Sequence, residues 1–283
     1  MLQSNLQPEE LHRMSLNFKP VAGLLASLDL LHIEVDASVM HIRLNRPEKR
    51  NAVNDTMVNQ LRTCFVNLPS EIGAAILTGA GDHFCAGLDL SELSERSVAE
   101  GVFHSRNWHA VMDTIQFGRV PVVSVLHGAV IGGGMEIASA THVRVAEETA
   151  YYALPEGQRG IFVGGGGSVR IPRLIGVACM AEMMLTGSVV DAAEGKSLGF
   201  SRYVVAKGQG FAKACELAIK IASNAPLSNF AVIQALPRIA DMSQQDGLFV
   251  EALMVGIAQG DDAAKQRVRA FLGKRAAKVG KTS

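Results

Sequence analysis

The sequence predicts an α/β fold that ends in a helical region. In the first half of the 283-residue chain, short apolar segments typical of strands alternate with segments of helical periodicity. The last third has helical periodicity almost throughout. A hydrophobic content of 48% is enough for one sizeable core. We therefore expect an N-terminal extension over residues 1–28, an α/β core over 29–205 and a C-terminal helical region over 206–283.

Three segments of the first half predict strands. HIEVDASVMHIRLNR, residues 32–46, alternates apolar and polar residues on both sides of a turn near residues 36–38, which indicates a β-hairpin. AAILTG, residues 74–79, and VPVVSVLHG, residues 120–128, are short apolar runs, and the second is rich in β-branched residues. Such runs are typical of buried strands.

Helices are predicted between and after these strands. Asn54 can cap a helix that ends before Pro69, because apolar residues recur between the two at helical spacing. Further helices are expected around residues 98–117, 178–186, 191–198, 208–223 and 245–272. The C-terminal helices either pack back on the core or form an arm for oligomerisation.

Charge and cysteine content narrow the class of function. Lysine plus arginine and aspartate plus glutamate both number 27, so no general attraction to nucleic acid or to an anionic membrane is expected. The four cysteines form no CxxC pair, which argues against a disulfide framework and favours a reducing cytoplasm. The longest uncharged stretch, residues 120–135, is too short for a transmembrane helix.

Two glycine-containing turns can each present a backbone N–H group. VSVLHGAVIGGGMEIA, residues 123–138, runs from a strand through Gly133 into a helix whose first turn holds Glu136. GAGDHFCAGLDL, residues 79–90, ends a strand and frees the N–H of Leu88 from regular pairing. Two such donors make an oxyanion hole, in which each is worth roughly 3 kcal/mol of barrier. Alternatively, the glycines only relieve crowding and the second turn is an ordinary loop.

A second acidic residue stands near a run of four glycines. LPEGQRGIFVGGGG, residues 154–167, holds Glu156 in an otherwise apolar segment. The glycines either cradle an anionic group or only allow a tight turn to pack. For Glu156 the simpler alternative is a solvated loop charge, and for Glu136 an acid that complements a helix dipole.

Five segments together resemble the enoyl-CoA hydratase/isomerase, or crotonase, family. They occur in the family's order and spacing, and the resemblance covers roughly residues 30–275. The segments are NRPEKRNAVN, HFCAGLDL, HGAVIGGGMEIA, LPEGQRGIFVGGGGSVR and LTGSVVDAAEGKSLGF. The resemblance implies a crotonase-like spiral of repeated ββα units and a site that binds an acyl-CoA thioester. It places the two oxyanion N–H groups on Leu88 and Gly133 and the two catalytic glutamates on Glu136 and Glu156.

The resemblance also implies where coenzyme A binds. It places the adenosine near Arg50 and Ala52 and near Ala86 and Leu90, with Lys49 or Arg50 available for a phosphate. These cations are equally well read as a solvated charge run. The glycines of residues 164–167 are expected to leave room for the acyl chain and an attacking water.

The expected assembly is a homotrimer or a dimer of trimers. Family members often use a late helix of a neighbouring subunit to cover coenzyme A, and Lys274 is a candidate for that contact. The sequence departs from the family pattern just before, because Gln266 and Arg267 replace the usual acidic residue and glycine. This departure weakens the prediction of the subunit contact.

Two carboxylates beside two N–H donors favour hydration of an enoyl-CoA. One can act as base on water and the other can deliver a proton, provided that their environments separate their pKa values. Alternatives on the same scaffold are a double-bond isomerase and a thioester or carbon–carbon hydrolase. A non-catalytic binding or scaffold protein, including one for RNA, is a further alternative, which the neutral charge disfavours. The sequence lacks dinucleotide-binding, P-loop and HExxH motifs, so neither metal nor cofactor is expected beyond the coenzyme A of the substrate.

Overall fold

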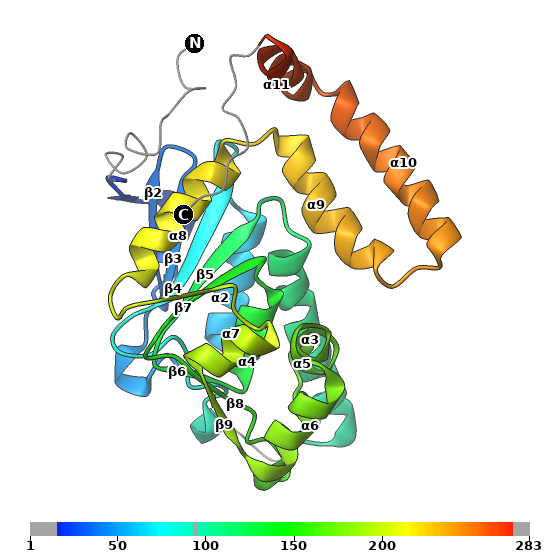
Figure 1. Ribbon diagram of the computed structural model, residues 1–283. Coiled ribbons are helices and arrows are strands. Elements are labelled where there is room, and N and C mark those ends of the chain that lie inside the picture. Colours follow the sequence, from blue (N-terminus) through cyan, green and yellow to red (C-terminus); the bar gives the residue numbers. More distant parts are fainter. Residues whose placement is uncertain (1–15, 93–95, 274–283) are drawn as a thin grey trace.

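A computed structural model describes residues 16–92 and 96–273 of the chain, and these form two β-sheets surrounded by helices (Figure 1). The larger, seven-stranded sheet contains, in spatial order, β1 (Lys19–Pro20), β2 (Leu31–Asp36), β3 (Val39–Leu44), β4 (Ala74–Gly79), β5 (Val122–Leu126), β7 (Val143–Glu147) and β10 (Tyr203–Val205). The smaller, three-stranded sheet contains β6 (Ala129–Ile131), β8 (Tyr151–Ala153) and β9 (Val189–Asp191).

Helices connect the strands and extend beyond them. The α-helices are α2 (Asp55–Val66), α3 (Val98–Gln116), α4 (Gly133–Ala140), α5 (Gly167–Ile175), α6 (Val177–Thr186), α7 (Ala192–Leu198), α8 (Gly210–Ala222), α9 (Pro226–Ile239), α10 (Gln244–Gly260) and α11 (Asp262–Leu272). Short 3-10 helices are η1 (Gly23–Ser27), η2 (Pro47–Lys49), η3 (Leu90–Glu92) and η4 (Gly157–Arg159).

The chain moves from one sheet to the other as it advances. β5 lies in the larger sheet and β6 in the smaller, and the same step is repeated by β7 and β8. β4 pairs in parallel with β5, β5 with β7, and β6 with β8. This repetition is the predicted spiral, and it brings the ends of β6 and β8 to one edge of the smaller sheet.

The larger sheet carries a separate apolar cluster on each face. Ile76 of β4 packs with Ala214 and Ala218 of α8 in one cluster. Its neighbours Ala75 and Leu77 point to the opposite face, because successive strand residues alternate, and pack there with residues of α2, α3 and α4. Both faces are therefore buried, which agrees with the continuous apolar runs predicted for the central strands.

Several predicted elements are confirmed. β2 and β3 form the hairpin, with Ile33 opposite Ile42. The Asn54 side chain accepts a hydrogen bond from the N–H of Met57 at 2.9 Å, which caps α2 as expected. α3, α6, α7 and α8 also lie within two residues of their predicted bounds.

The prediction of one helix over residues 245–272 is wrong. Asp261 has an extended conformation, with φ −70° and ψ 134°, which separates α10 from α11. Its carboxylate then caps α11 by accepting from the N–H of Ala264 at 3.2 Å. α5 was not expected from the sequence, and α9 lies in the region predicted as helical although its bounds were not predicted. Each contains an interior proline, Pro172 in α5 and Pro237 in α9, and proline normally argues against a helix.

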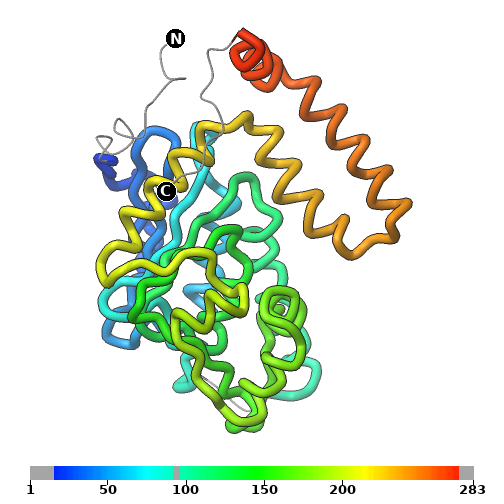
Figure 2. Tube along the Cα trace, viewed as in Figure 1, coloured from blue at the N-terminus to red at the C-terminus, as the bar shows by residue number. Residues whose placement is uncertain are grey.

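The two ends of the described chain differ in how they pack. β1 pairs with β2, and Leu25 and Leu28 are buried, so part of the predicted extension belongs to the core. By contrast, α10 buries only Gly247, and Figures 1 and 2 show α10 and α11 standing away from the sheets beyond α9. The division into regions 1–28, 29–205 and 206–283 stays a prediction. None of the described helices is long and apolar enough to cross a membrane.

Candidate active site

The parallel pair β6 and β8 brings Glu136 and Glu156 to one place. Ile131 at the end of β6 pairs with Ala153 at the end of β8. The N–H of Gly132, directly after β6, donates to the carbonyl oxygen of Ala153 at 2.9 Å. Each strand is followed within a few residues by its glutamate, Glu136 in the first turn of α4 and Glu156 just before η4. Both carboxyl groups are buried at this edge of the smaller sheet.

Backbone N–H groups hold the carboxylate of Glu136. Its Oε1 accepts hydrogen bonds from the N–H of Gly165 at 2.7 Å and from the N–H of Gly167 at 2.8 Å. Burial raises the pKa of Glu136 above its ordinary value, and the two N–H groups oppose part of that rise. Oε1 is therefore fixed in position by two hydrogen bonds, and neither of them involves Oε2.

The run of glycines is required by this contact. A methyl group at position 167 would lie 2.8 Å from Cγ of Glu136, and one at position 165 would lie 3.2 Å from its Cδ. Gly166 between them has φ +92°, which favours glycine. Of the two alternatives that the sequence left open, the glycines cradle an anionic group, and that group is the carboxylate of Glu136.

Glu156 lies against the start of α4 without a fixed partner. A methyl group at Gly132 would lie 2.6 Å from its Oε1, so the carboxyl group approaches the backbone there closely. Among the described residues, its buried Oε2 has no hydrogen-bond partner. Burial raises the pKa of Glu156 to about 7, and the negative charge of Glu136 adds to the rise. This carboxyl group can therefore hold and release a proton near neutral pH.

The loop that carries Leu88 is held between two neighbouring segments. On one side, the N–H of Val53 donates to the carbonyl oxygen of Gly87 at 2.8 Å. On the other side, the N–H of Cys85 donates to Ala129 of β6 at 3.0 Å, and the N–H of Ile131 donates to Cys85 at 3.0 Å. These bonds tie the loop to the strand that leads into Gly133.

The N–H groups of Leu88 and Gly133 lie side by side. A methyl group at Gly133 would be 3.4 Å from the nitrogen of Leu88, and one at Gly87 would be 3.4 Å from the nitrogen of Gly133. Gly133 is the first residue of α4, so its N–H has no partner within the helix. Within the described part of the chain, neither N–H donates to a protein acceptor. Two N–H groups without a protein acceptor therefore lie close together near the two glutamates.

The residues expected to bind coenzyme A lie next to the loop of Leu88. The N–H of Ala86 donates to the carbonyl oxygen of Arg50 at 3.0 Å, and the N–H of Ala52 donates to that of Lys49 at 3.0 Å. Lys49, Arg50 and Leu90 are exposed. The structure thus brings these predicted residues together at the surface, while their contact with coenzyme A stays a prediction. Lys274 lies outside the described residues.

A partly buried ion pair next to this surface was missed by the sequence analysis. Arg46 and Asp89 are 3.0 Å apart, and Arg46 also donates to the carbonyl oxygen of Ala52 at 2.8 Å. The buried Asn51 adds bonds to the carbonyl oxygens of Ala80 and His83 at 2.8 and 2.7 Å. These bonds join the segments NRPEKRNAVN and HFCAGLDL. No local pattern in the sequence indicates that the two segments pair.

Helix α3 supplies residues that sequence analysis did not assign to the site. Ser105 donates to the carbonyl oxygen of Gly164 at 2.7 Å. Arg170 donates to the carbonyl oxygen of Gly165 at 3.2 Å and pairs with Asp113 of α3 at 2.6 Å. Trp108 is buried, and its ring lies against Gly165, where the resemblance implied room for an acyl chain. α3 therefore fixes the glycine turn from outside.

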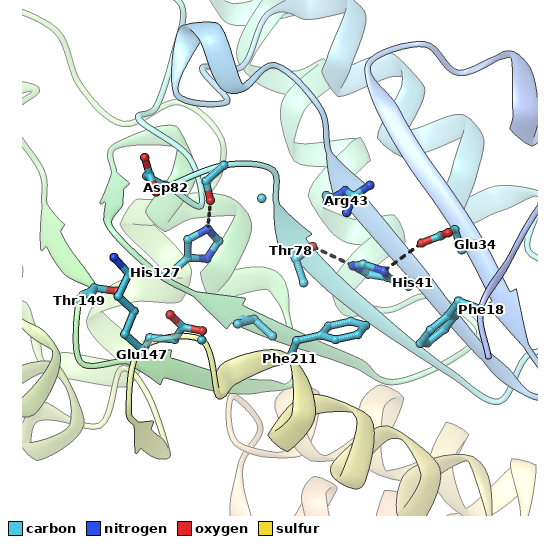
Figure 3. A pocket seen from close by; sticks show the side chains of 15 residues that line it. Phe18, Glu34, His41, Arg43, Thr78, Asp82, His127, Glu147, Thr149 and Phe211 are labelled. Carbon is cyan, nitrogen blue, oxygen red and sulfur yellow. Dashed lines mark hydrogen bonds and ion pairs between the residues drawn. The ribbon is translucent and has the colours of Figure 1, made fainter. Parts of the chain in front are cut away.

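A cavity of about 660 Å³ lies away from these residues (Figure 3). It opens at the carboxyl ends of β4, β5 and β7, beside the start of α8. Its wall includes Glu34 and His41, which lie 3.7 Å apart, and Phe211. None of the predicted site residues lines it.

Comparisons with known proteins identify the family of the chain. The model of the family described as "Enoyl-CoA hydratase/isomerase" matches residues 34–281. The enoyl-CoA hydratase EchA19 of Mycobacterium tuberculosis is 31% identical over 250 residues, which cover 86% of this chain and 94% of the relative. The short-chain-enoyl-CoA hydratase of Clostridium acetobutylicum is 31% identical over 246 residues, with 86% and 94% covered.

A solved structure shares the fold at higher identity. It comes from Rhodopseudomonas palustris, carries a provisional enoyl-CoA hydratase name and is 57% identical to this chain. The likeness covers 91% of this chain and all of that one, with a TM-score of 0.85. The α/β fold and the predicted family resemblance are both confirmed by these comparisons.

Proposed function

The chain is an enzyme of the enoyl-CoA hydratase/isomerase family, and from that premise we propose that it adds water across the α,β double bond of an acyl-CoA thioester. The observation that carries the proposal is the meeting of two buried glutamates with two free N–H groups at one edge of the smaller sheet. The hydratase names of several relatives support the same reaction.

The N–H groups of Leu88 and Gly133 receive the thioester oxygen. Attack of water on the β-carbon moves negative charge onto that oxygen, and the intermediate has enolate character. Donors that already point at the oxygen stabilise this charge without further rearrangement, and each is worth on the order of 3 kcal/mol. Since the two donors are free in the structure, no internal hydrogen bond has to break before the substrate binds.

The two glutamates divide the proton transfers. Glu136 is the base, because the N–H groups of Gly165 and Gly167 fix one of its oxygens and oppose part of the rise in pKa that burial causes. It takes a proton from water as the oxygen bonds to the β-carbon. Glu156 delivers a proton to the α-carbon, because its pKa of about 7 leaves it partly protonated at neutral pH. Proton exchange with solvent after product release restores both groups.

The assay follows the conjugated double bond of the substrate. Purified protein is mixed with crotonyl-CoA, and the absorbance of the conjugated thioester is expected to fall. A double variant, Glu136→Gln with Glu156→Gln, gives the background rate. A 3-enoyl-CoA in a parallel sample tests the isomerase alternative, since isomerisation would raise the same absorbance. If no crotonyl-, longer-chain or aromatic enoyl-CoA loses absorbance, the proposed hydration is wrong.

The proposed assembly is a homotrimer or a dimer of trimers. The support is the apolar surface of the C-terminal helices. α10 and α11 pack mainly against each other and against α9. Exposed apolar residues on α10 and α11 are Leu248, Phe249, Leu253, Val255, Ile257, Val268, Phe271 and Leu272. An exposed apolar surface of this kind is typical of an interface. Light scattering after gel filtration should give three or six chain masses, and a monomer at micromolar concentration would contradict the proposal.

The proposed location is the cytoplasm. All four cysteines, Cys64, Cys85, Cys179 and Cys215, are free thiols. Burial raises the pKa of Cys64 and of Cys85 to about 12, so both stay in the unreactive thiol form. Unpaired cysteines are typical of proteins in a reducing compartment. The reaction as proposed uses only groups of the chain itself, and the absence of a further cofactor stays a prediction.

A further inference from the structure

Trp108 of α3 spans the gap between the two halves of the site. A methyl group at Gly133 would lie 3.3 Å from Cζ3 of the indole, and one at Gly165 would lie 3.0 Å from Cε3. The edge of the six-membered ring therefore touches both the turn that presents a proposed oxyanion donor and the turn that holds Glu136. The side chain is buried, with 3% of its surface exposed.

The same ring edge lies beside the atoms that would face the substrate. A methyl group added at Gly133 would also lie 3.4 Å from the nitrogen of Leu88. One added at Gly165 would also lie 3.2 Å from Oε2 of Glu136. An acyl group held between these atoms has its α- and β-carbons next to the indole. The hydrocarbon edge of Trp108 therefore forms a wall at the reacting carbons.

Packing alone holds this wall in place. Within the described part of the chain, no acceptor lies in reach of the buried Nε1 of Trp108, although buried tryptophans usually find one. A purely structural role would make Trp108 one more member of the core that α3 shares with the sheets. That role predicts loss of stability on truncation, but no change in which substrate the enzyme prefers.

We infer that Trp108 determines acyl specificity and limits the enzyme to short-chain acyl-CoA substrates. The inference rests on the proposed function, because it takes the thioester oxygen to lie at Leu88 and Gly133. With the α- and β-carbons beside the indole edge, the ring limits the space for the carbons that follow, and its close packing against Gly133 and Gly165 restrains it. Removing the ring opens the space that a longer chain needs.

The test compares two substrates in three proteins. The ratio of kcat/KM for crotonyl-CoA to that for 2-decenoyl-CoA is measured in wild type, in Trp108→Ala and in Ile115→Ala. Ile115 is fully buried on the same helix two turns away, so its variant controls for lost core volume. We expect Trp108→Ala to lower the ratio by at least about tenfold, mainly through faster turnover of the long substrate, and Ile115→Ala to leave it unchanged. An unchanged ratio in Trp108→Ala overturns the inference.

Trp108→Phe serves if the alanine variant does not fold. It shortens the wall by replacing the indole with a phenyl ring, and the one polar group that it removes is an N–H without an acceptor among the described residues. An intermediate ratio is expected for it, and a ratio equal to wild type in a folded Trp108→Phe counts against the inference.

A binding measurement separates failure of this inference from failure of the proposed reaction. Trp108 is the only tryptophan in the chain, so its fluorescence reports on the site directly. We expect butyryl-CoA to change the emission of wild type more than coenzyme A does. Butyryl-CoA and decanoyl-CoA are also titrated into wild type and Trp108→Ala by calorimetry. If neither enoyl-CoA is hydrated, the proposed reaction is wrong. The inference about Trp108 is still supported if the ratio of the affinities for butyryl-CoA and decanoyl-CoA differs at least about tenfold between wild type and Trp108→Ala. Equal affinity ratios overturn it.

Discussion

The N–H of Gly165 donates a hydrogen bond to Oε1 of Glu136 at 2.7 Å, although the two residues are 29 positions apart in the sequence. This bond, together with the one from Gly167, fixes a buried carboxylate by backbone atoms alone. The position of the proposed base therefore depends on the absence of side chains in a turn that belongs to another element.

Gly167→Ala tests this dependence. An added methyl group would lie 2.8 Å from Cγ and 2.9 Å from Oε1 of Glu136, so the carboxylate must shift. Displacing a catalytic group by roughly an ångström costs about a hundredfold in rate, and we expect kcat for crotonyl-CoA to fall at least about tenfold. Gly164→Ala is the matched control, because the nearest atom, Oγ of Ser105, is 3.9 Å from the added group. Equal rates for the two variants would contradict the assigned role of the turn.

Glu156→Gln removes the proposed proton donor while keeping the shape of the side chain. We expect kcat for crotonyl-CoA to fall by about a hundredfold or more, the usual scale for a general acid or base. The affinity for butyryl-CoA, measured by calorimetry, should stay within about twofold, because Glu156 has no role in holding the thioester oxygen. Glu182→Gln, an exposed glutamate on α6, is the control and should match wild type. Turnover like that of wild type in Glu156→Gln would refute the assignment.

The rate should depend on pH through the same group. Since Glu156 must carry a proton to act as the acid, kcat/KM should decline as pH rises through about 7, the pKa of that carboxyl group. Glu136 must be ionised to act as the base, so the rate should also decline at low pH. The profile is therefore bell-shaped. Kinetics between roughly pH 5 and pH 9 in one buffer mixture check this shape, and a flat alkaline side would show that Glu156 is not the acid.

Local patterns were enough to predict the central elements, whereas the two glutamates were predicted from the resemblance to the family. The cap at Asn54 and the alternation in β2 and β3 depend on neighbouring residues, so the sequence displays them directly. Glu136 and Glu156 were predicted because family motifs surround them. Their shared burial depends on the parallel pairing of β6 with β8.

Contacts between distant segments were not predictable in this way. Trp108 lies on a helix of mixed polarity, and nothing near it in the sequence shows that it meets Gly133 and Gly165. The same holds for the carboxylate of Glu136, whose glycine partners follow a different strand. α9 falls within the region predicted as helical, but its bounds were not predicted, and its interior residue Pro237 is one that normally argues against a helix.

Burial of Glu156 should also lower the stability of the wild-type enzyme at neutral pH. Its pKa in the folded protein is about 7, above the ordinary glutamate value of 4.5, so folding favours the protonated form. The stability that this form contributes is complete below about pH 4.5 and is lost as pH rises towards about 7. The side chain in Glu156→Gln is neutral at every pH, so that variant does not lose this stability. Between about pH 4.5 and about pH 7, the free energy of unfolding of wild type should therefore fall by at most about 3 kcal/mol relative to that of Glu156→Gln.

Thermal unfolding at two pH values checks this loss. At about pH 8 the Tm of Glu156→Gln should exceed that of wild type by several degrees, and the difference should shrink at about pH 5. Both proteins are compared at one concentration, because assembly also raises Tm. Glu182→Gln again serves as the control, because it removes one exposed carboxylate and leaves the buried glutamates unchanged. A Tm difference that is the same at both pH values would mean that Glu156 titrates alike in the folded and unfolded chain, and its assignment as a proton donor near neutral pH would lose its physical basis.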